Sequence, residues 1–412
     1  MAIITIFSAD FCKEKQLITR LSEKTGFKPT SIDQILSEAA TLSGMDKEKV
    51  KKALSFKTSV FERFTHEKQF ALAYIKLVLS KMLMVSAGRD LILNGYATQL
   101  IPREITHFYR VGLISDMQTR IKEMMKTEKI SEKEAEKIIK QLDTEQVQWL
   151  ARYCEMDDPF NPAEYDLIIP MNKESVEDAS DLIISHMDDD IFQPNAASRQ
   201  AVRDFNLQAT VEVALAAKGH NVIVHANRFK INILINKNVT RLGRLEKELR
   251  SIVSQVDGVE EIEIGVSKRF HKNDIYRKYD MTLPSRVLLV DDEQEFVETL
   301  SDRLILRKMG TAVAHDGESA LKLIENDPPE VMVLDLKMDG VDGIEVLRRV
   351  KQNNPSIEVI ILTGHGSEDD KEECMKLGAF AYLRKPLDIS QLSAVIKKAD
   401  EKIKKSAKKN KA

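Results

Sequence analysis

The chain has 412 residues, a formal net charge of −3 and three cysteines. This length predicts about two to four domains, each large enough to bury its own core. The near-neutral charge selects neither nucleic acid nor a membrane surface, and the scattered cysteines exclude a disulfide framework and fit a reducing compartment. Because we find no cationic leader before an apolar core and no apolar run of about eighteen residues, we expect a cytoplasmic protein.

Residues 1–186 open with a buried-strand pattern, Met1–Phe7, which is followed by the loop Ser8–Lys15. A phosphate-binding loop in this place needs glycines, so that backbone amides can approach the phosphates, and a lysine that reaches them. This loop contains no glycine, and Asp10 would put a negative charge where phosphates bind. The residues alone therefore predict a poor phosphate site.

The same segment resembles the cytidylate kinase-like family, through the opening strand, the run Asp90–Leu93 and the stretch Gln118–Ser175. Within that stretch, Ser131–Glu134 has the pattern of a capping box before a helix. The resemblance implies an α/β fold like that of the P-loop kinases. It covers most of the segment.

Several positions depart from that family. The glycine-rich loop is missing, Asn94-Gly95-Tyr96 stands where Gly-Arg-Gly is usual, and Gln146 stands where a lid arginine is usual. Arg120 could survive as a nucleotide-site residue, although a solvated surface arginine is the simpler interpretation. Since phosphoryl transfer depends on these charged and positioning groups, we expect a kinase-like domain without catalytic activity.

Residues 187–204 combine an acidic run, a proline and small polar side chains, which is typical of a linker. Residues 205–266 then predict a small α+β domain with the order αββαβ. Its elements are a helix through Leu215, strands at 221–226 and 230–236, a helix at 241–256 and a strand at 261–266. This order resembles a BON domain, a family associated with membrane or ligand binding, so we expect an interaction or spacer module.

A second linker, residues 267–284, precedes a segment of alternating strand and helix patterns at 285–405, and a basic tail covers 406–412. Strands that alternate with helices indicate a parallel sheet covered on both faces. The expected strands are 286–290, 311–315, 331–334, 358–362 and 380–384.

Four of these strands end in polar side chains. Asp291 and Asp292 follow the first strand, Asp335 follows the third, and the last two end at Thr363 and Lys385. Ligands bind at the carboxyl ends of strands in open α/β sheets, so we expect the carboxylates to converge. Two like charges about 4 Å apart repel by roughly 4 kcal/mol at an effective dielectric constant of about 20, which favours a bound cation. Oxygen ligands suit Mg²⁺, and the lysine and threonine could contact a phosphoryl group.

The stretches RVLLVDDE, VLDLKMDGVDGIEVL, VIILTGHG and AYLRKPLD resemble the receiver domain of two-component response regulators. The resemblance implies a flavodoxin-like, doubly wound (βα)5 fold, in which Asp335 accepts a phosphoryl group from a histidine kinase or phosphotransfer protein. It also implies that Mg²⁺ is held by Asp291, Asp292, Asp335 and the backbone carbonyl of Lys337.

Further roles follow from the same resemblance. Thr363 and Lys385 would contact the phosphoryl group, and Tyr382 matches the aromatic residue that changes rotamer on activation. The side chains of Lys337 and His365 would lie at the rim, where they could tune dephosphorylation or simply face solvent. Asp339 stands where the family usually has proline.

The favoured hypothesis is a response regulator whose phosphorylation switches interactions of the kinase-like and middle domains. A homodimer through the receiver face is a further expectation. No helix-turn-helix pattern follows the receiver segment, so no DNA partner is predicted. Two alternatives remain open: a nucleotide kinase of the cytidylate type that the receiver regulates, and a signalling adaptor recruited to a membrane by the middle domain.

Overall fold

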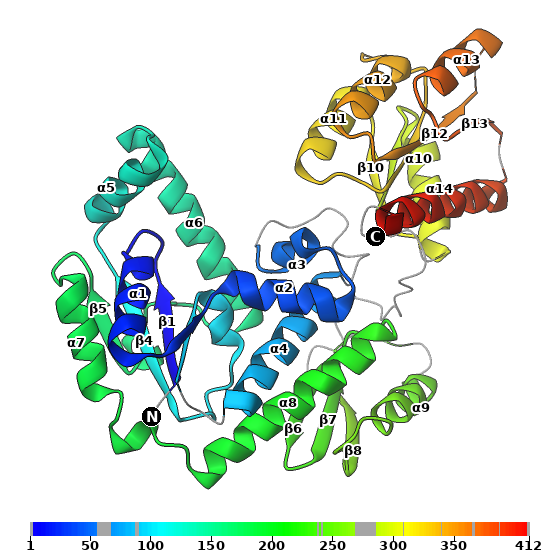
Figure 1. Ribbon diagram of the computed structural model, residues 1–412. Helices are drawn as coiled ribbons and strands as arrows, with labels where there is room; N and C mark the ends of the chain where they lie inside the picture. Colours follow the sequence, from blue (N-terminus) through cyan, green and yellow to red (C-terminus); the bar gives the residue numbers. More distant parts are fainter. Residues whose placement is uncertain are drawn as a thin grey trace. The chain divides into compact units, whose positions relative to one another are not determined.

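The computed structural model describes residues 3–55, 67–86, 90–236, 239, 242–267, 286–307, 309–338, 340–364, 367–386 and 388–409. The described residues up to Ser267 form one compact unit, and those from Arg286 form a second (Figure 1). His365, Asp339 and most of the predicted linker 267–284 lie outside the described residues.

The first unit contains a five-stranded sheet in the order β2-β3-β1-β4-β5, with all its strands parallel. The strands are β1 (Ile3–Ser8), β2 (Lys28–Thr30), β3 (Leu91–Asn94), β4 (Phe108–Ile114) and β5 (Leu167–Pro170). Successive residues of β1 face opposite sides, so that Ile3 and Phe7 enter one core while Ile4 and Ile6 enter the other. This confirms the α/β fold predicted for the N-terminal segment.

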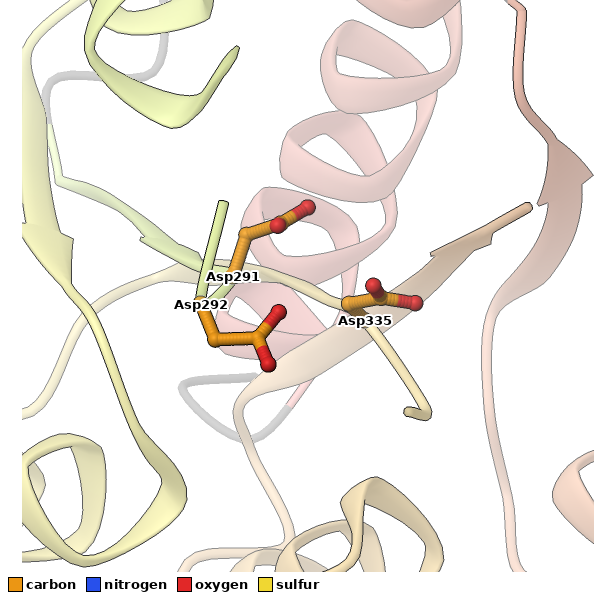
Figure 2. A group of neighbouring side chains, drawn as sticks. All are labelled: Asp291, Asp292 and Asp335. Carbon is orange, nitrogen blue, oxygen red and sulfur yellow. The ribbon is translucent and has the colours of Figure 1, made fainter. Parts of the chain in front are cut away.

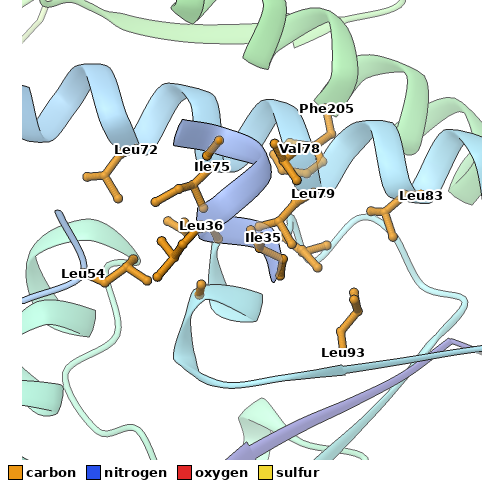
Figure 3. Packing of buried hydrophobic residues seen from close by; sticks show 14 of the residues in the cluster. Ile35, Leu36, Leu54, Leu72, Ile75, Val78, Leu79, Leu83, Leu93 and Phe205 are labelled. Carbon is orange, nitrogen blue, oxygen red and sulfur yellow. The ribbon is translucent and has the colours of Figure 1, made fainter. Parts of the chain in front are cut away.

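Helices cover both faces of this sheet. One core is closed by α1 (Glu14–Thr25) and α7 (Val176–His186). The other is closed by α2 (Ile32–Ser43), α3 (Lys47–Ala53), α4 (Glu67–Ser86) and the end of α6 (Glu132–Tyr153), as Figure 3 shows in part. Helix α5 (Met117–Glu128) and the first part of α6 form a hairpin with a small core of its own.

The middle module has the predicted order αββαβ. It consists of α8 (Ala196–Ala217), the antiparallel hairpin of β6 (Ile223–Asn227) and β7 (Lys230–Ile235), then α9 (Leu242–Val253) and β8 (Glu261–Val266), which pairs parallel to β7. Ile231, Ile233 and Ile235 point to one face and meet α8 and α9 in a separate core. This alternation was the signal for the strand in the sequence.

Helix α8 begins inside the segment predicted to be a linker. Asn195 caps it by accepting a hydrogen bond from the amide of Ser198 at 2.8 Å, and the helix runs on without interruption to Ala217. Its first half buries Val202 and Phe205 in the core beneath α4, and Figure 3 shows Phe205 beside Val78. Its second half enters the core of the middle module. The predicted boundary at residue 205 therefore falls within a helix.

The second unit is a doubly wound sheet in the order β10-β9-β11-β12-β13, with all strands parallel. Its strands are β9 (Val287–Val290), β10 (Thr311–Ala314), β11 (Val331–Leu334), β12 (Glu358–Thr363) and β13 (Ala381–Arg384). One face is covered by α11 (Gly317–Asn326), α12 (Gly343–Asn353) and α13 (Glu368–Lys376), and the other by α10 (Gln294–Leu306) and α14 (Ile389–Lys409). The flavodoxin-like fold predicted here is confirmed.

Candidate functional site

The register of the second sheet brings the ends of β9 and β11 side by side. Val290 pairs with Leu334, and the amide of Asp335 donates a hydrogen bond to the Val290 carbonyl at 2.9 Å. Asp291 and Asp292 leave β9 at the same edge at which Asp335 leaves β11 (Figure 2). Strand register thus makes neighbours of acids that lie more than forty residues apart in the sequence.

The three aspartates offer carboxylate oxygens that all lie within 4.8 Å of one another. Asp291 and Asp335 are buried, with 4% and 6% of their surface exposed. Burial raises the pKa of Asp291, and the hydrogen bond from Lys385 offsets only part of this rise. An oxygen-only set of closely spaced carboxylates fits Mg²⁺, which takes oxygen ligands and is bound through few protein groups.

Lys385 reaches this edge from the end of β13. Its ammonium group donates hydrogen bonds to Asp291 Oδ2 at 2.7 Å, to Glu293 Oε1 at 3.0 Å and to Asp335 Oδ2 at 3.3 Å. Burial lowers the pKa of Lys385, but the hydrogen bonds to the acids outweigh it and leave the pKa above its ordinary value. The group is therefore a fixed positive charge inside the acidic cluster.

The structure places the remaining predicted residues of this site as follows. Thr363 ends β12 and is fully buried, and its carbonyl accepts the Lys385 amide at 2.9 Å. The peptide bond between Lys385 and Pro386 is cis. Tyr382 lies on β13 with its hydroxyl buried, and no hydrogen-bond partner for that hydroxyl is found among the described residues. Lys337 follows Asp335 by two positions and exposes its side chain to solvent.

A tight backbone contact shapes the loop after Asp335. The amide of Gly343 donates to the Leu336 carbonyl at 3.0 Å, and a Cβ at position 343 would lie 2.6 Å from Leu336 Cα and closer still to the Asp335 carbonyl oxygen. Only glycine fits this approach. Its signal in the sequence is a glycine at the first position of a helix, which did not by itself point to the site.

Two further residues belong to the site although sequence reasoning did not select them. Glu293 is one of the three acceptors of the Lys385 ammonium, and Phe296 places its ring centre 4.3 Å from the same nitrogen. Their signal in the sequence was only their position in the first turn after Asp292. Nothing in that pattern shows which way they face.

In the first unit, the side chains near the loop after β1 bind one another. Arg120 donates from Nε to the Asp10 carbonyl at 2.8 Å and forms two hydrogen bonds with the Asp143 carboxylate. Arg120 is 5% exposed, so the interpretation of it as a solvated surface arginine is wrong. The partner that offsets the cost of burial is Asp143, which lies on α6 and was not recognised as such in the sequence.

Residues of the loop after β1 contact other parts of the first unit. Phe11, in the left-handed region at φ 64°, packs against the small core of the α5–α6 hairpin. Gln146 donates to the Ser8 carbonyl at 3.4 Å, and Asn94 donates to the Glu14 carboxylate at 3.2 Å. The loop thus has contacts to side chains of the hairpin and of β3.

Comparison with known proteins accounts for the second unit. Residues 287–397 match the family model of the response regulator receiver domain. Sporulation initiation phosphotransferase F of Bacillus subtilis is 34% identical over 113 residues, which are 27% of this chain and 91% of that protein. The chain belongs to the response regulators. Receiver domains of this family take phosphoryl groups from histidine kinases or phosphotransfer proteins and generally use Mg²⁺.

Another relative of this response regulator matches over a similar length of chain. Regulatory protein AtoC of Escherichia coli is 32% identical over 119 residues, which are 29% of this chain and 26% of that protein. The chain thus spans about a quarter of the length of that relative. A solved receiver domain from Clostridium thermocellum is 33% identical and covers 29% of this chain and 95% of its own, with a TM-score of 0.28.

The first unit of the response regulator carries a second match. Residues 3–173 match the model of the cytidylate kinase-like family, which supports the resemblance seen in the sequence. Among the helices that the structure describes, none has both the length and the apolar character needed to cross a lipid bilayer.

Proposed function

We propose that Asp335 is the phosphorylation site of this response regulator, and that the receiver controls the interactions of the first unit. The observation that carries this proposal is the cluster of Asp291, Asp292 and Asp335 within 4.8 Å, with the Lys385 ammonium between two of its members. A carboxylate acceptor, a cation site and a lysine for the phosphoryl oxygens are the groups that transfer to an aspartate requires.

In the proposed reaction, a carboxylate oxygen of Asp335 attacks the phosphorus of a phosphohistidine. The new P–O bond forms as the P–N bond breaks, and the electron pair of that bond returns to the imidazole. The amide of Leu336 orients the carboxylate by donating to Asp335 Oδ1 at 2.7 Å. Asp291, Asp292, Asp335 and the Lys337 carbonyl would hold Mg²⁺, which when bound neutralises charge on the phosphoryl oxygens.

We assign the switch to Thr363 and Tyr382. The Thr363 hydroxyl would hydrogen-bond a phosphoryl oxygen, and Tyr382 would change rotamer as Thr363 moves. Tyr382 lies on β13 and pairs with Ile361 of β12, two residues before Thr363. The surface formed by α13, β13 and α14 is therefore the face that responds, and it is also the face proposed for a homodimer.

For the first unit we propose a binding role without phosphoryl transfer. Arg120 is already bound by Asp143 and Asp10, and the loop has no glycine that would let its amides approach a phosphate. The middle module, which resembles a BON domain in its order of elements, would serve the same output. Its ligand class, including a membrane surface, is open to test by co-sedimentation with liposomes.

The deciding experiment is to incubate the full chain with acetyl phosphate and Mg²⁺ and to measure the phosphorylated fraction by mass spectrometry. Wild type should be labelled, Asp335→Asn should not, and Asp369→Asn, which removes an exposed aspartate of α13, should behave like wild type. Equal labelling of wild type and Asp335→Asn would overturn the proposed site.

A parallel assay of the full chain tests the first unit. With ATP and CMP or dCMP as substrates we expect no turnover and no shift in melting temperature. Turnover would establish the alternative of a receiver-regulated nucleotide kinase.

A further inference from the structure

The Lys385 ammonium is held from four sides, and two of the groups that hold it lie outside the three aspartates of the site. Glu293 accepts its hydrogen bond at 3.0 Å, and the Phe296 ring lies under it at 4.3 Å. Asp291 and Asp335 supply the other two contacts. The lysine side chain is only 13% exposed, whereas Glu293 reaches it from the rim with 66% of its own side chain exposed.

This arrangement sets a competition. In the proposed function the same ammonium must turn to a phosphoryl oxygen on Asp335. Asp291 and Asp335 belong to the reacting centre and stay beside the phosphoryl group. Glu293 holds the ammonium from outside that centre. Its hydrogen bond therefore stabilises the position that Lys385 takes in the unphosphorylated protein. The face of an aromatic ring attracts a cation, and Phe296 therefore helps to keep the ammonium on the side where Glu293 binds it.

The backbone supports Glu293 in this place. Its amide donates to Asp291 Oδ1 at 3.0 Å, which ties the residue to the aspartate that shares its lysine. Glu293 is the N-cap of helix α10, which starts at the next residue and carries Phe296 in its first turn. The carboxylate and the ring are therefore placed together, and the lysine enters between them from β13.

We propose that Glu293 is a positioning residue that restrains Lys385 in the unphosphorylated protein and thereby slows and limits phosphorylation of Asp335. This inference rests on the proposed function and adds to it a residue that sets the responsiveness of the site. The restraint is a contact between two side chains of the receiver, Glu293 and Lys385, and involves no other part of the chain.

The test compares phosphorylation by acetyl phosphate in the full chain with Glu293→Gln, Glu293→Asp and Glu298→Gln. Glu298 is an exposed acid of the same helix and is not among the acceptors of Lys385, so its variant removes an equal charge without the contact. Exposed ion pairs contribute about 0.2–1 kcal/mol, so Glu293→Gln should raise the initial rate roughly 1.5- to fivefold. Glu293→Asp should also raise it, because the shorter side chain keeps the charge but loses reach, and Glu298→Gln should match wild type.

A double-mutant cycle separates restraint of the lysine from simple repulsion of the anionic donor. If Glu293 acts through Lys385, Glu293→Gln should leave the rate unchanged in a Lys385→Met background, where labelling is followed over longer times. An equal increase in both backgrounds would overturn the inference, as would equal rates for Glu293→Gln and wild type. Absence of labelling in wild type would instead overturn the proposed function, and this inference with it.

Discussion

Arg120 and Asp143 are joined by two hydrogen bonds, from the two terminal guanidinium nitrogens to the two carboxylate oxygens, at 2.9 and 2.6 Å. The pair connects α5 to α6, and the remaining Nε donor of Arg120 is taken by the carbonyl of Asp10. A planar guanidinium that is matched in this way at a carboxylate and a carbonyl has no further in-plane fork to offer a phosphate. Arg120 therefore joins the α5–α6 hairpin to the loop after β1.

Removing the carboxylate should therefore destabilise the first unit. Asp143→Asn leaves the buried guanidinium without its charged partner, and we expect a loss of roughly 1–3 kcal/mol in the free energy of unfolding. Denaturant titration followed by fluorescence measures it, since the single tryptophan, Trp149, is buried in this unit. Glu136→Gln, which breaks an exposed pair with Lys140 on the same helix, should change little. Equal losses of stability in the two variants would contradict the role of Asp143 as the partner of a buried arginine.

The stability of the first unit should fall in mild acid because of His107. This side chain is buried, lies directly before β4 and contacts the Ser198 hydroxyl of α8. Burial lowers its pKa, and the charges of Arg199 and Arg110 lower it further. The unfolded chain therefore binds a proton more readily than the folded protein. The His107 contribution is complete above the unfolded pKa of about 6.5 and is lost as the pH falls through the folded pKa.

Denaturation curves at pH 7.5, 6.5 and 5.5 test this, with Trp149 as the reporter. His107→Gln should show a smaller loss of stability between these pH values than wild type. His225→Gln, which replaces an exposed histidine on β6, should lose as much as wild type does. If His107→Gln lost as much stability as wild type between pH 7.5 and 5.5, His107 would not be a source of the acid sensitivity.

Mg²⁺ should stabilise the second unit through the aspartate cluster. At a concentration ten times its dissociation constant, a ligand that binds only the folded state adds about 1.4 kcal/mol. Hydrogen exchange of β9 and β11 should slow accordingly in wild type. Asp291→Asn should abolish this response and raise the metal-free stability, because one of three mutually repelling carboxylates is gone. A Mg²⁺ response retained in Asp291→Asn would place the ion elsewhere.

Two glycine-to-alanine substitutions should have opposite effects on the free energy of unfolding. Gly343→Ala would push a methyl group against Leu336 Cα and the Asp335 carbonyl, and we expect it to cost about 1–3 kcal/mol and to abolish phosphorylation. Gly243→Ala lies on the exposed first turn of α9 with no atom within 4 Å of the new Cβ, and it should gain about 0.4–1 kcal/mol. Thermal unfolding of both variants, with labelling by acetyl phosphate, decides the matter.

Tyr382→Phe should separate stability from switching. The Tyr382 hydroxyl is buried with no hydrogen-bond partner among the described residues, so its removal should leave stability unchanged or raise it by up to about 1 kcal/mol. Labelling of Asp335 should persist, while the response of the α13–β13–α14 face, measured by hydrogen exchange with and without acetyl phosphate, should weaken. An undiminished response would remove Tyr382 from the switch.

The receiver fold could be predicted almost completely from the sequence. Its strands are buried on both faces, so each appears as a short continuous apolar run, as Val331–Leu334 does. The polar side chains that end the strands then follow from the rule for parallel sheets, which is why Asp291 and Asp335 could be paired from the sequence alone. Glu293 could not, because a single exposed acid carries no signal of the distant lysine that it binds.

The segment 187–204 shows where composition misleads. Small polar residues beside a proline are typical of a connector, yet Asn195 acts as a helix cap and Ala196 begins a long helix. Whether such residues end one element or begin another depends on the apolar residues that follow, here Val202 and Phe205, and on the core that receives them. The burial of Arg120 could not be predicted either, because it depends on Asp143, which lies in another helix.

Helix α8 belongs to two cores of the first unit. Phe205 belongs to the core beneath α4, and Leu215, ten residues on, belongs to the core of the middle module. Between them Lys76 of α4 forms an ion pair with Glu212 at 3.0 Å, and Asn206 donates to Ser80 at 3.0 Å. A helix anchored on both sides in this way is no hinge. The middle module and the kinase-like sheet share this one continuous helix, so we expect them to move together.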